Sequence, residues 1–90
     1  MSLNDVSFLL SSPLSKKILY CLNDSKEPLA PLQIAKKCDI ARSNVSTKLG
    51  ILTKHGLVEA VNPEARKWRF YKITRKGKTT VKQVDKIQIK

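Results

Sequence analysis

The chain has 90 residues, and its 18 Lys and Arg against 7 Asp and Glu give a formal net charge of +11 at pH 7. This length allows one small domain, and a hydrophobic content of 41% excludes a chain that is disordered throughout. No run approaches the roughly 20 apolar residues of a membrane span, and no secretion signal is evident, so we expect a cytoplasmic protein that binds polyanions.

Two helices are predicted in the first quarter of the chain. Asn4 or Asp5 is a candidate cap for a short helix through Leu10. Ser12 followed by Pro13 is a stronger start, because Ser caps helices and Pro is favoured in the first turn. The apolar residues that follow repeat at helical spacing: Leu14, Ile18, Cys21 and Leu22. We expect this face to be buried.

Two further helices are predicted on either side of a tight turn. Pro31 opens a short helix that ends at Cys38, and Asp39 is a residue type that tolerates the left-handed conformation of such a turn. The next helix runs from about Arg42 to His55 and stops at Gly56. Its expected buried edge is Val45, Leu49 and Leu52, and its opposite side carries Ser43, Thr47, Gly50, Ile51 and Lys54.

The period of the apolar pattern then changes to two, which is typical of strands. Runs of β-branched and aromatic residues at 57–61 and 68–73 are separated by turn-forming residues 62–67, which predicts a hairpin with a basic tip. Thr74 is placed to cap a last helix, whose apolar stripe is Gly77, Val81, Val84 and Ile87.

Three segments together resemble a known family: PLQIAKKCDIARSNVSTKL (31–49), LTKHGLV (52–58) and YKITRKG (71–77). Their order is similar to that of MarR/ArsR-like regulators, and the compact size is most similar to small archaeal transcriptional regulators. The resemblance implies a winged helix-turn-helix, a mainly α fold with a small β-hairpin (α+β). We expect one domain over 1–90, with its core at 12–86, the helix-turn-helix at 31–55, the wing at 57–73 and the C-terminal helix at 74–87.

The resemblance also implies a sequence-specific transcriptional regulator that binds double-stranded DNA. Helix 42–55 would enter the major groove, and the wing would touch the backbone or minor groove. Short polar side chains with longer cations beside them suit groove contact. The candidate residues on this helix are Arg42, Ser43, Asn44, Ser46, Thr47 and Lys48, and those on the wing are Arg66, Lys67 and Arg69. A solvated polar face is the alternative interpretation of both sets.

The charge distribution agrees with this placement. Residues 1–45 carry six basic and four acidic side chains, whereas residues 46–90 carry twelve basic and three acidic ones. Among the aromatic residues of the hairpin, Trp68 is expected to pack under the wing. Ile51 is expected on the exposed side of its helix, where a thymine methyl, the wing or a partner surface are open alternatives.

Two alternative functions are separated by specificity and by surface chemistry. A non-specific architectural DNA-binding protein would share the steep salt dependence of a regulator but lack its preference for one site. A winged-helix protein-interaction module would present an apolar or acidic surface, for which Ile51, Trp68 and Phe70 are candidates. The basic second half favours DNA.

The terminal helices are the predicted means of forming a homodimer. Val81, Val84 and Ile87 form a stripe that a 90-residue monomer need not bury, and a second apolar edge is provided by Phe8, Leu9 and Leu10. Related proteins pair through such helices, which sets two recognition helices about 34 Å apart. The alternative is that both ends pack on their own core.

Other chemistry is not indicated by the sequence. Cys21, Cys38 and His55 lie on three predicted elements and make a poor zinc site, so we expect buried, reduced thiols and no metal or cofactor. No nucleophile with a general base and no phosphate-binding loop is recognisable, so we expect no enzymatic activity. No small-molecule ligand is inferred, and membrane binding is disfavoured because the last helix lacks large apolar residues.

Overall fold

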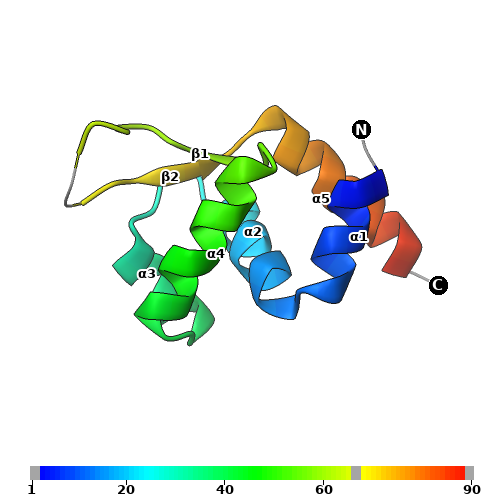
Figure 1. The fold of residues 1–90 in the computed structure, drawn as a ribbon, viewed down its shortest axis with the longest axis horizontal. Helices are drawn as coiled ribbons and strands as arrows, with labels where there is room; N and C mark the ends of the chain where they lie inside the picture. Colours follow the sequence, from blue (N-terminus) through cyan, green and yellow to red (C-terminus); the bar gives the residue numbers. More distant parts are fainter. Residues whose placement is uncertain (1–2, 66–67, 89–90) are drawn as a thin grey trace.

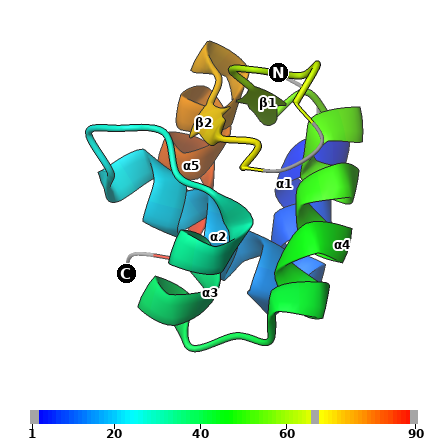
Figure 2. The same cartoon turned by 90° about the vertical axis from the view of Figure 1, so that its left-hand side faces the viewer.

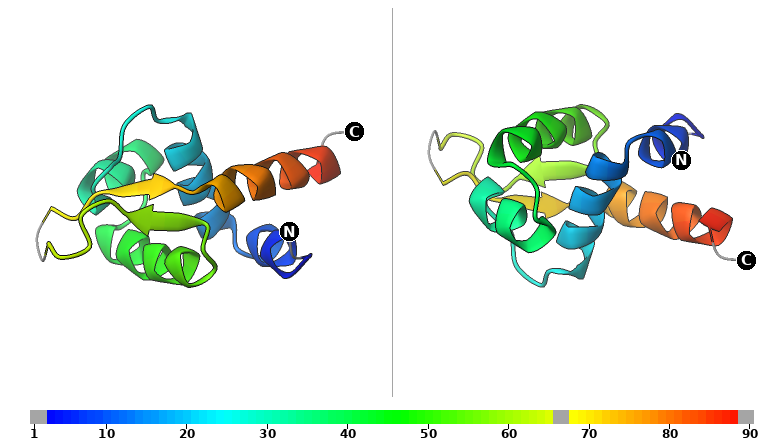
Figure 3. Two further views of the ribbon diagram at one scale, coloured as in Figure 1. Left: turned by 90° about the horizontal axis from the view of Figure 1, so that it is seen from above. Right: turned by 90° about the horizontal axis from the view of Figure 1, so that it is seen from below.

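The described residues of this computed structural model, 3–65 and 68–88, form helices and an antiparallel two-stranded sheet (Figure 1). The elements in chain order are α1 (Leu3–Ser11), α2 (Pro13–Asp24), α3 (Pro31–Cys38), α4 (Arg42–Lys54), β1 (Val58–Ala60), β2 (Tyr71–Ile73) and α5 (Arg75–Gln88). The hairpin projects from one end of the molecule, and α1 and α5 lie at the other (Figure 3). This architecture confirms the expected mainly α fold with a small hairpin.

Asp39, Ala41 and Gly56 mark the end of α3 and the start and end of α4. Asp39 ends α3 with a φ of 57°, in the left-handed region as expected. Ala41 precedes α4 and provides no side-chain cap, so the first N–H groups of α4 are left without a side-chain partner. At the other end of α4, Gly56 has a φ of 75°, a conformation that glycine adopts without strain.

The core lies where the apolar faces of α1, α2, α3, α4 and α5 meet the start of the hairpin. Its fully buried side chains include Leu9, Ile18, Leu19, Ile34, Val45, Leu49, Leu52, Leu57, Val58 and Val84. Burial of each such side chain contributes about 1.5–3 kcal/mol through the hydrophobic effect. The buried edge predicted for α4 is therefore confirmed. Cys21, expected in the core, is half-buried instead.

The burial of α5 corrects one expectation. Val81 and Val84, interpreted as a dimer surface, are only 3% and 0% exposed, because α5 packs along α1 and α2 of the same chain. Of the three proposed interface residues only Ile87, at 49%, is exposed. Leu9 of the second apolar edge is also buried, whereas Leu10 is 41% exposed. The apolar surface of these stripes that remains for a second copy therefore lies mainly at Leu10 and Ile87.

The paired part of the hairpin is shorter than the predicted runs 57–61 and 68–73. Val58 pairs with Ile73, Glu59 with Lys72 and Ala60 with Tyr71. Beyond these pairs the Val61 amide still donates to the Phe70 carbonyl at 2.9 Å. The Phe70 amide instead donates to Oδ1 of Asn62 at 2.8 Å, and Nδ2 of Asn62 donates to the Trp68 carbonyl at 3.1 Å. An amide that binds a side chain no longer pairs with the opposite strand.

A bridge that the sequence pattern did not indicate ties the connection before α3 to the hairpin. The backbone of Leu29 exchanges two hydrogen bonds with Tyr71, at 2.9 and 2.8 Å. Leu29 is 5% exposed, so its side chain also anchors this connection to the core. The start of α3 is thereby fixed next to the start of β2.

A polar cluster joins His55, the residue that follows α4, to the terminal helices α1 and α5. Asp5 of α1 is 5% exposed at its side chain, and its Oδ1 lies 2.8 Å from Nδ1 of His55. Its Oδ2 lies 3.3 Å from Nζ of Lys76 in α5, without a hydrogen bond of good geometry. Lys76 also donates to the His55 carbonyl at 2.8 Å, and the His55 ring stacks on Phe8. Burial raises the pKa of Asp5, but His55 and Lys76 outweigh it and hold that pKa below its ordinary value.

We expect Asp5→Asn to lower the free energy of unfolding by about 2 kcal/mol at neutral pH, because it removes the charge from a buried, paired position. A lowered carboxyl pKa stabilises the fold above the unfolded-state pKa and ceases to do so as the pH falls through the folded-state pKa. The difference between the wild type and the variant should therefore shrink below about pH 4. Urea unfolding at several pH values measures it.

The exposed Asp24 at the end of α2 provides the control for that measurement. Asp24→Asn makes the same chemical change at a solvated position, so we expect a change below about 0.5 kcal/mol. Equal effects of the two substitutions at neutral pH would show that the Asp5 cluster does not stabilise the fold.

Candidate nucleic-acid interface

The exposed face of α4 carries most of the residues expected to contact DNA. Arg42, Ser43, Asn44, Ser46 and Thr47 are exposed, and Lys48 is half-buried at the border of the face. Apart from the adjoining residues and backbone of α4 itself, no described atom lies within 4 Å of the position that a Cβ at Gly50 would occupy. Figure 2 shows α4 along one edge of the molecule, with α3 beside its first turn and the hairpin above. The face is open along its length.

The Thr47 hydroxyl on this face already makes a hydrogen bond within α4. Thr47 donates its hydroxyl proton to the Ser43 carbonyl at 3.0 Å, which leaves the hydroxyl oxygen as an acceptor and exposes the methyl group. Such a side chain offers an apolar contact and an acceptor to a base edge.

Ile51, expected to be exposed, is half-buried.

The wing contributes one described residue of the three that were predicted. Arg66 and Lys67 lie outside the described residues. Arg69 is half-buried, and its Nε and Nη2 donate to the Ala65 carbonyl at 3.0 and 2.8 Å. Because a guanidinium has five N–H donors, these two bonds leave three N–H groups for another acceptor. Arg69 thus shapes the wing and retains binding capacity.

Trp68 corrects another expectation. It was expected under the wing, but it is 64% exposed and has a φ of 56°, which is unusual for a bulky residue. A left-handed tryptophan costs about 1–2 kcal/mol of backbone strain. The hydrogen bond from Asn62 Nδ2 to the Trp68 carbonyl helps to hold this conformation.

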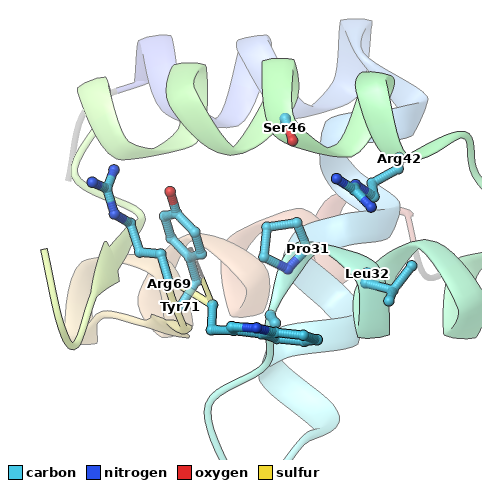
Figure 4. A pocket seen from close by; sticks show the side chains of 8 residues that line it. Pro31, Leu32, Arg42, Ser46, Arg69 and Tyr71 are labelled. Carbon is cyan, nitrogen blue, oxygen red and sulfur yellow. The ribbon is translucent and has the colours of Figure 1, made fainter. Parts of the chain in front are cut away.

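A recess of about 510 Å³ lies between α4, the start of α3 and the returning arm of the wing at residues 68–71 (Figure 4). Arg42 and Ser46 enter it from α4, and Arg69 and Tyr71 flank it from the hairpin. Pro31 and Leu32 of α3 form an apolar wall. The structure therefore brings Arg69 of the hairpin beside Arg42 and Ser46 of α4, three of the predicted DNA-binding residues. The bridge between Leu29 and Tyr71 positions the α3 wall and was not foreseen.

These features define a winged helix-turn-helix. Residues 10–61 match the profile of a helix-turn-helix domain family, and the chain belongs to that family. The match covers α2, α3, α4 and β1. Among curated protein sequences, none matches the chain significantly.

Solved structures of similar fold include MarR-family proteins. The transcriptional regulator BldR from Sulfolobus solfataricus is 22% identical, with a TM-score of 0.73 over 93% of this chain and 60% of that one. Apo MarR from E. coli is 21% identical, with a TM-score of 0.72 over 92% of this chain and 64% of its own. A MarR-family protein from Bacillus stearothermophilus is 17% identical, with a TM-score of 0.72, and covers 93% of this chain and 60% of that one. This chain thus spans less than two thirds of the length of each.

Within residues 3–65 and 68–88, no helix has the length and apolar character needed to span a membrane. No three His, Cys, Asp or Glu side chains in the same residues form a group that could hold a metal ion. His55 is engaged by Asp5, and the two cysteines lie together on α2 and α3.

Proposed function

We propose that this protein is a sequence-specific transcriptional regulator that binds double-stranded DNA. The proposal rests on the exposed face of α4, where short polar side chains lie between Arg42 and Lys48 and are not covered by any of the described residues. With α4 in the major groove, Ser43, Asn44 and Thr47 meet base edges at short range. The wing then lies against the backbone or the minor groove.

The recess beside α4 suits one phosphodiester strand. Arg42 and Arg69 enclose it with positive charge, and Ser46 and Tyr71 add hydroxyl donors. The net charge of +11 supplies further attraction to DNA that does not depend on sequence. Backbone contact therefore provides affinity and fixes the orientation of α4, while the short polar residues of α4 provide the choice of sequence.

Wing variants should change affinity for every sequence alike. We expect Arg66→Ala, Lys67→Ala or Arg69→Ala to weaken binding to specific and random duplexes by similar factors, and each to reduce the salt slope of log Kd by about 1. Fluorescence anisotropy over a salt series measures both quantities. Glu64→Gln, which removes an exposed acidic side chain on the same connection, should not reduce the slope.

Variants on α4 should change sequence preference. We expect Asn44→Ala or Thr47→Ala to shift preference at one or two base pairs by about 1–3 kcal/mol each, with little change in the salt slope. Binding to a panel of single-base variants of the preferred site measures the shift. If the α4 and wing substitutions all leave DNA binding unchanged, the proposed face is wrong.

We further propose that two copies associate through the terminal helices. Leu10 of α1 and Ile87 of α5 remain 41% and 49% exposed after the chain has folded, and both helices lie away from the α4 face. A two-fold pair would present two recognition helices to half-sites about 34 Å apart. Sedimentation at micromolar concentration tests this, and a single species of 10.2 kDa would contradict it.

A further inference from the structure

The two cysteines of the chain meet across the contact between α2 and α3. Cys21 of α2 and Cys38, the last residue of α3, line one open recess of about 450 Å³. The Cys38 thiol donates to the Lys17 carbonyl, with sulfur and oxygen 3.9 Å apart. Lys17 lies one helical turn before Cys21, so the Cys38 sulfur rests on the stretch of α2 that carries Cys21.

The recess also determines how a reagent reaches the pair. Both cysteines are free thiols, Cys21 half-buried and Cys38 buried. A molecule that enters the recess therefore contacts the Cys21 sulfur first. Lys17 and Lys37 line the recess with two ammonium groups, against the single carboxylate of Asp24. This balance favours small molecules that carry negative charge.

We propose that Cys21 and Cys38 form a dithiol site that small anionic disulfide compounds oxidise to an intramolecular disulfide. The Cys21 thiolate attacks one sulfur of the compound, whose S–S bond breaks and releases one thiol. The Cys38 thiolate then attacks the Cys21 sulfur of this mixed disulfide and releases the second thiol. The protein gives up two electrons and two protons, which the two released thiols carry away.

The position of Cys38 connects this site to the helix-turn-helix. Cys38 is followed by Asp39, whose left-handed backbone makes the turn, and α4 begins at Arg42. A bond from Cys38 to Cys21 joins that turn covalently to α2. The loop that it closes contains the whole of α3, so oxidation restricts the chain around the first helix of the motif.

The surroundings of Cys21 set the rate of the first step. Burial is the main cause that raises the pKa of Cys21 to about 11. The Cys38 thiol and Asp24 also raise this pKa, whereas Lys37 lowers it. Lys17 and Tyr20 on α2 are the other ionisable groups that line the recess. The thiolate is therefore scarce at neutral pH, and the exchange rate should rise about tenfold per unit between about pH 7 and pH 9.

Oxidised glutathione, an anionic disulfide, is the probe for the test. The reduced full chain is incubated with it, remaining thiols are alkylated after unfolding, and the intact mass is measured. We expect a protein that has lost two hydrogen atoms, carries no alkyl group and retains no glutathione, with Cys21 and Cys38 in one linked peptide. The uncharged 2-hydroxyethyl disulfide should react more slowly at equal concentration.

Variants identify each step of the reaction. In Cys38→Ala the reaction should stop at a glutathione adduct on Cys21, and in Cys21→Ser the buried Cys38 should remain available for alkylation. Circular dichroism checks that both variants fold. The proposal is overturned if wild-type protein retains glutathione, forms disulfides only between two copies, or keeps both thiols free after prolonged incubation at about pH 9.

Discussion

Gly77→Ala should destabilise the fold by about 3 kcal/mol or more, the largest effect that we expect from the removal or addition of a single methyl group. A Cβ at this position would lie 2.2 Å from the Leu57 carbonyl oxygen and 2.6 Å from Cγ1 of Ile73. The first obstacle is backbone, which cannot rotate away as a side chain can. The start of α5 must then separate from the hairpin.

That separation would also break the hydrogen bonds that hold α5 in place. The Thr74 amide donates to the Leu57 carbonyl, and its hydroxyl donates to the Gly56 carbonyl at 2.7 Å. The Gly77 amide in turn donates to the Thr74 hydroxyl at 3.0 Å, which caps the helix. Urea unfolding monitored by circular dichroism measures the loss of stability.

Gly50→Ala is the matched control, because it makes the same substitution in the exposed middle of α4. No described atom outside the adjoining part of α4 lies within 4 Å of the added methyl group, and alanine favours a helix over glycine by about 1 kcal/mol, so this variant should be more stable than wild type. If Gly77→Ala unfolds at the same urea concentration as wild type, the close packing of α5 on Leu57 is contradicted.

Ser46→Glu should weaken DNA binding by about 100-fold, because it places a carboxylate against the phosphates of the bound strand. Ser46 is exposed on α4 and lines the recess beside Arg42 and Arg69. Its exposure also means that the substitution should change the free energy of unfolding by less than about 0.5 kcal/mol. Anisotropy titration of a labelled duplex measures the loss of affinity.

Ser7→Glu provides the matched control for charge. Ser7 is exposed on α1, which lies away from α3 and the wing (Figure 1), and the substitution lowers the net charge by the same amount. We expect its affinity to stay within about threefold of wild type, since screening by salt weakens a distant charge. Equal losses in the two variants would mean that net charge, and not the α4 face, determines binding.

Local signals in the sequence were sufficient to predict the helix-turn-helix. Pro31, Asp39 and Gly56 each mark a helix start or end through their own backbone preferences, and the structure uses all three as expected. The apolar spacing of Val45, Leu49 and Leu52 then separated the buried side of α4 from its open side. Most of the candidate interface was predictable because it belongs to one helix.

Features that depend on contacts between distant elements were not predictable in this way. The paired strands are short because Asn62 bonds the Phe70 amide, a contact that alternation of apolar residues does not encode. The stripe of α5 was interpreted as a dimer surface, although α1 and α2 cover Val81 and Val84. A stripe indicates that a face is covered but does not identify the element that covers it.

The same reason accounts for the polar contacts between elements. Asp5 and His55 are 50 residues apart in the chain, and nothing in either local segment points to the other. Cys21 and Cys38 lacked the close spacing of a recognisable motif, and they become a pair only through the packing of α2 on α3. Each contact follows from the fold and could be found only once the fold was known.

Selection of bound sequences from a pool of random duplexes tests the central claim most directly. A regulator that reads bases through α4 should enrich one motif and prefer it to random DNA by about 10³-fold or more. A dimer should enrich two inverted half-sites about one helical turn apart. Undiminished binding to every sequence, with random duplex competing as well as any selected one, would contradict sequence-specific recognition.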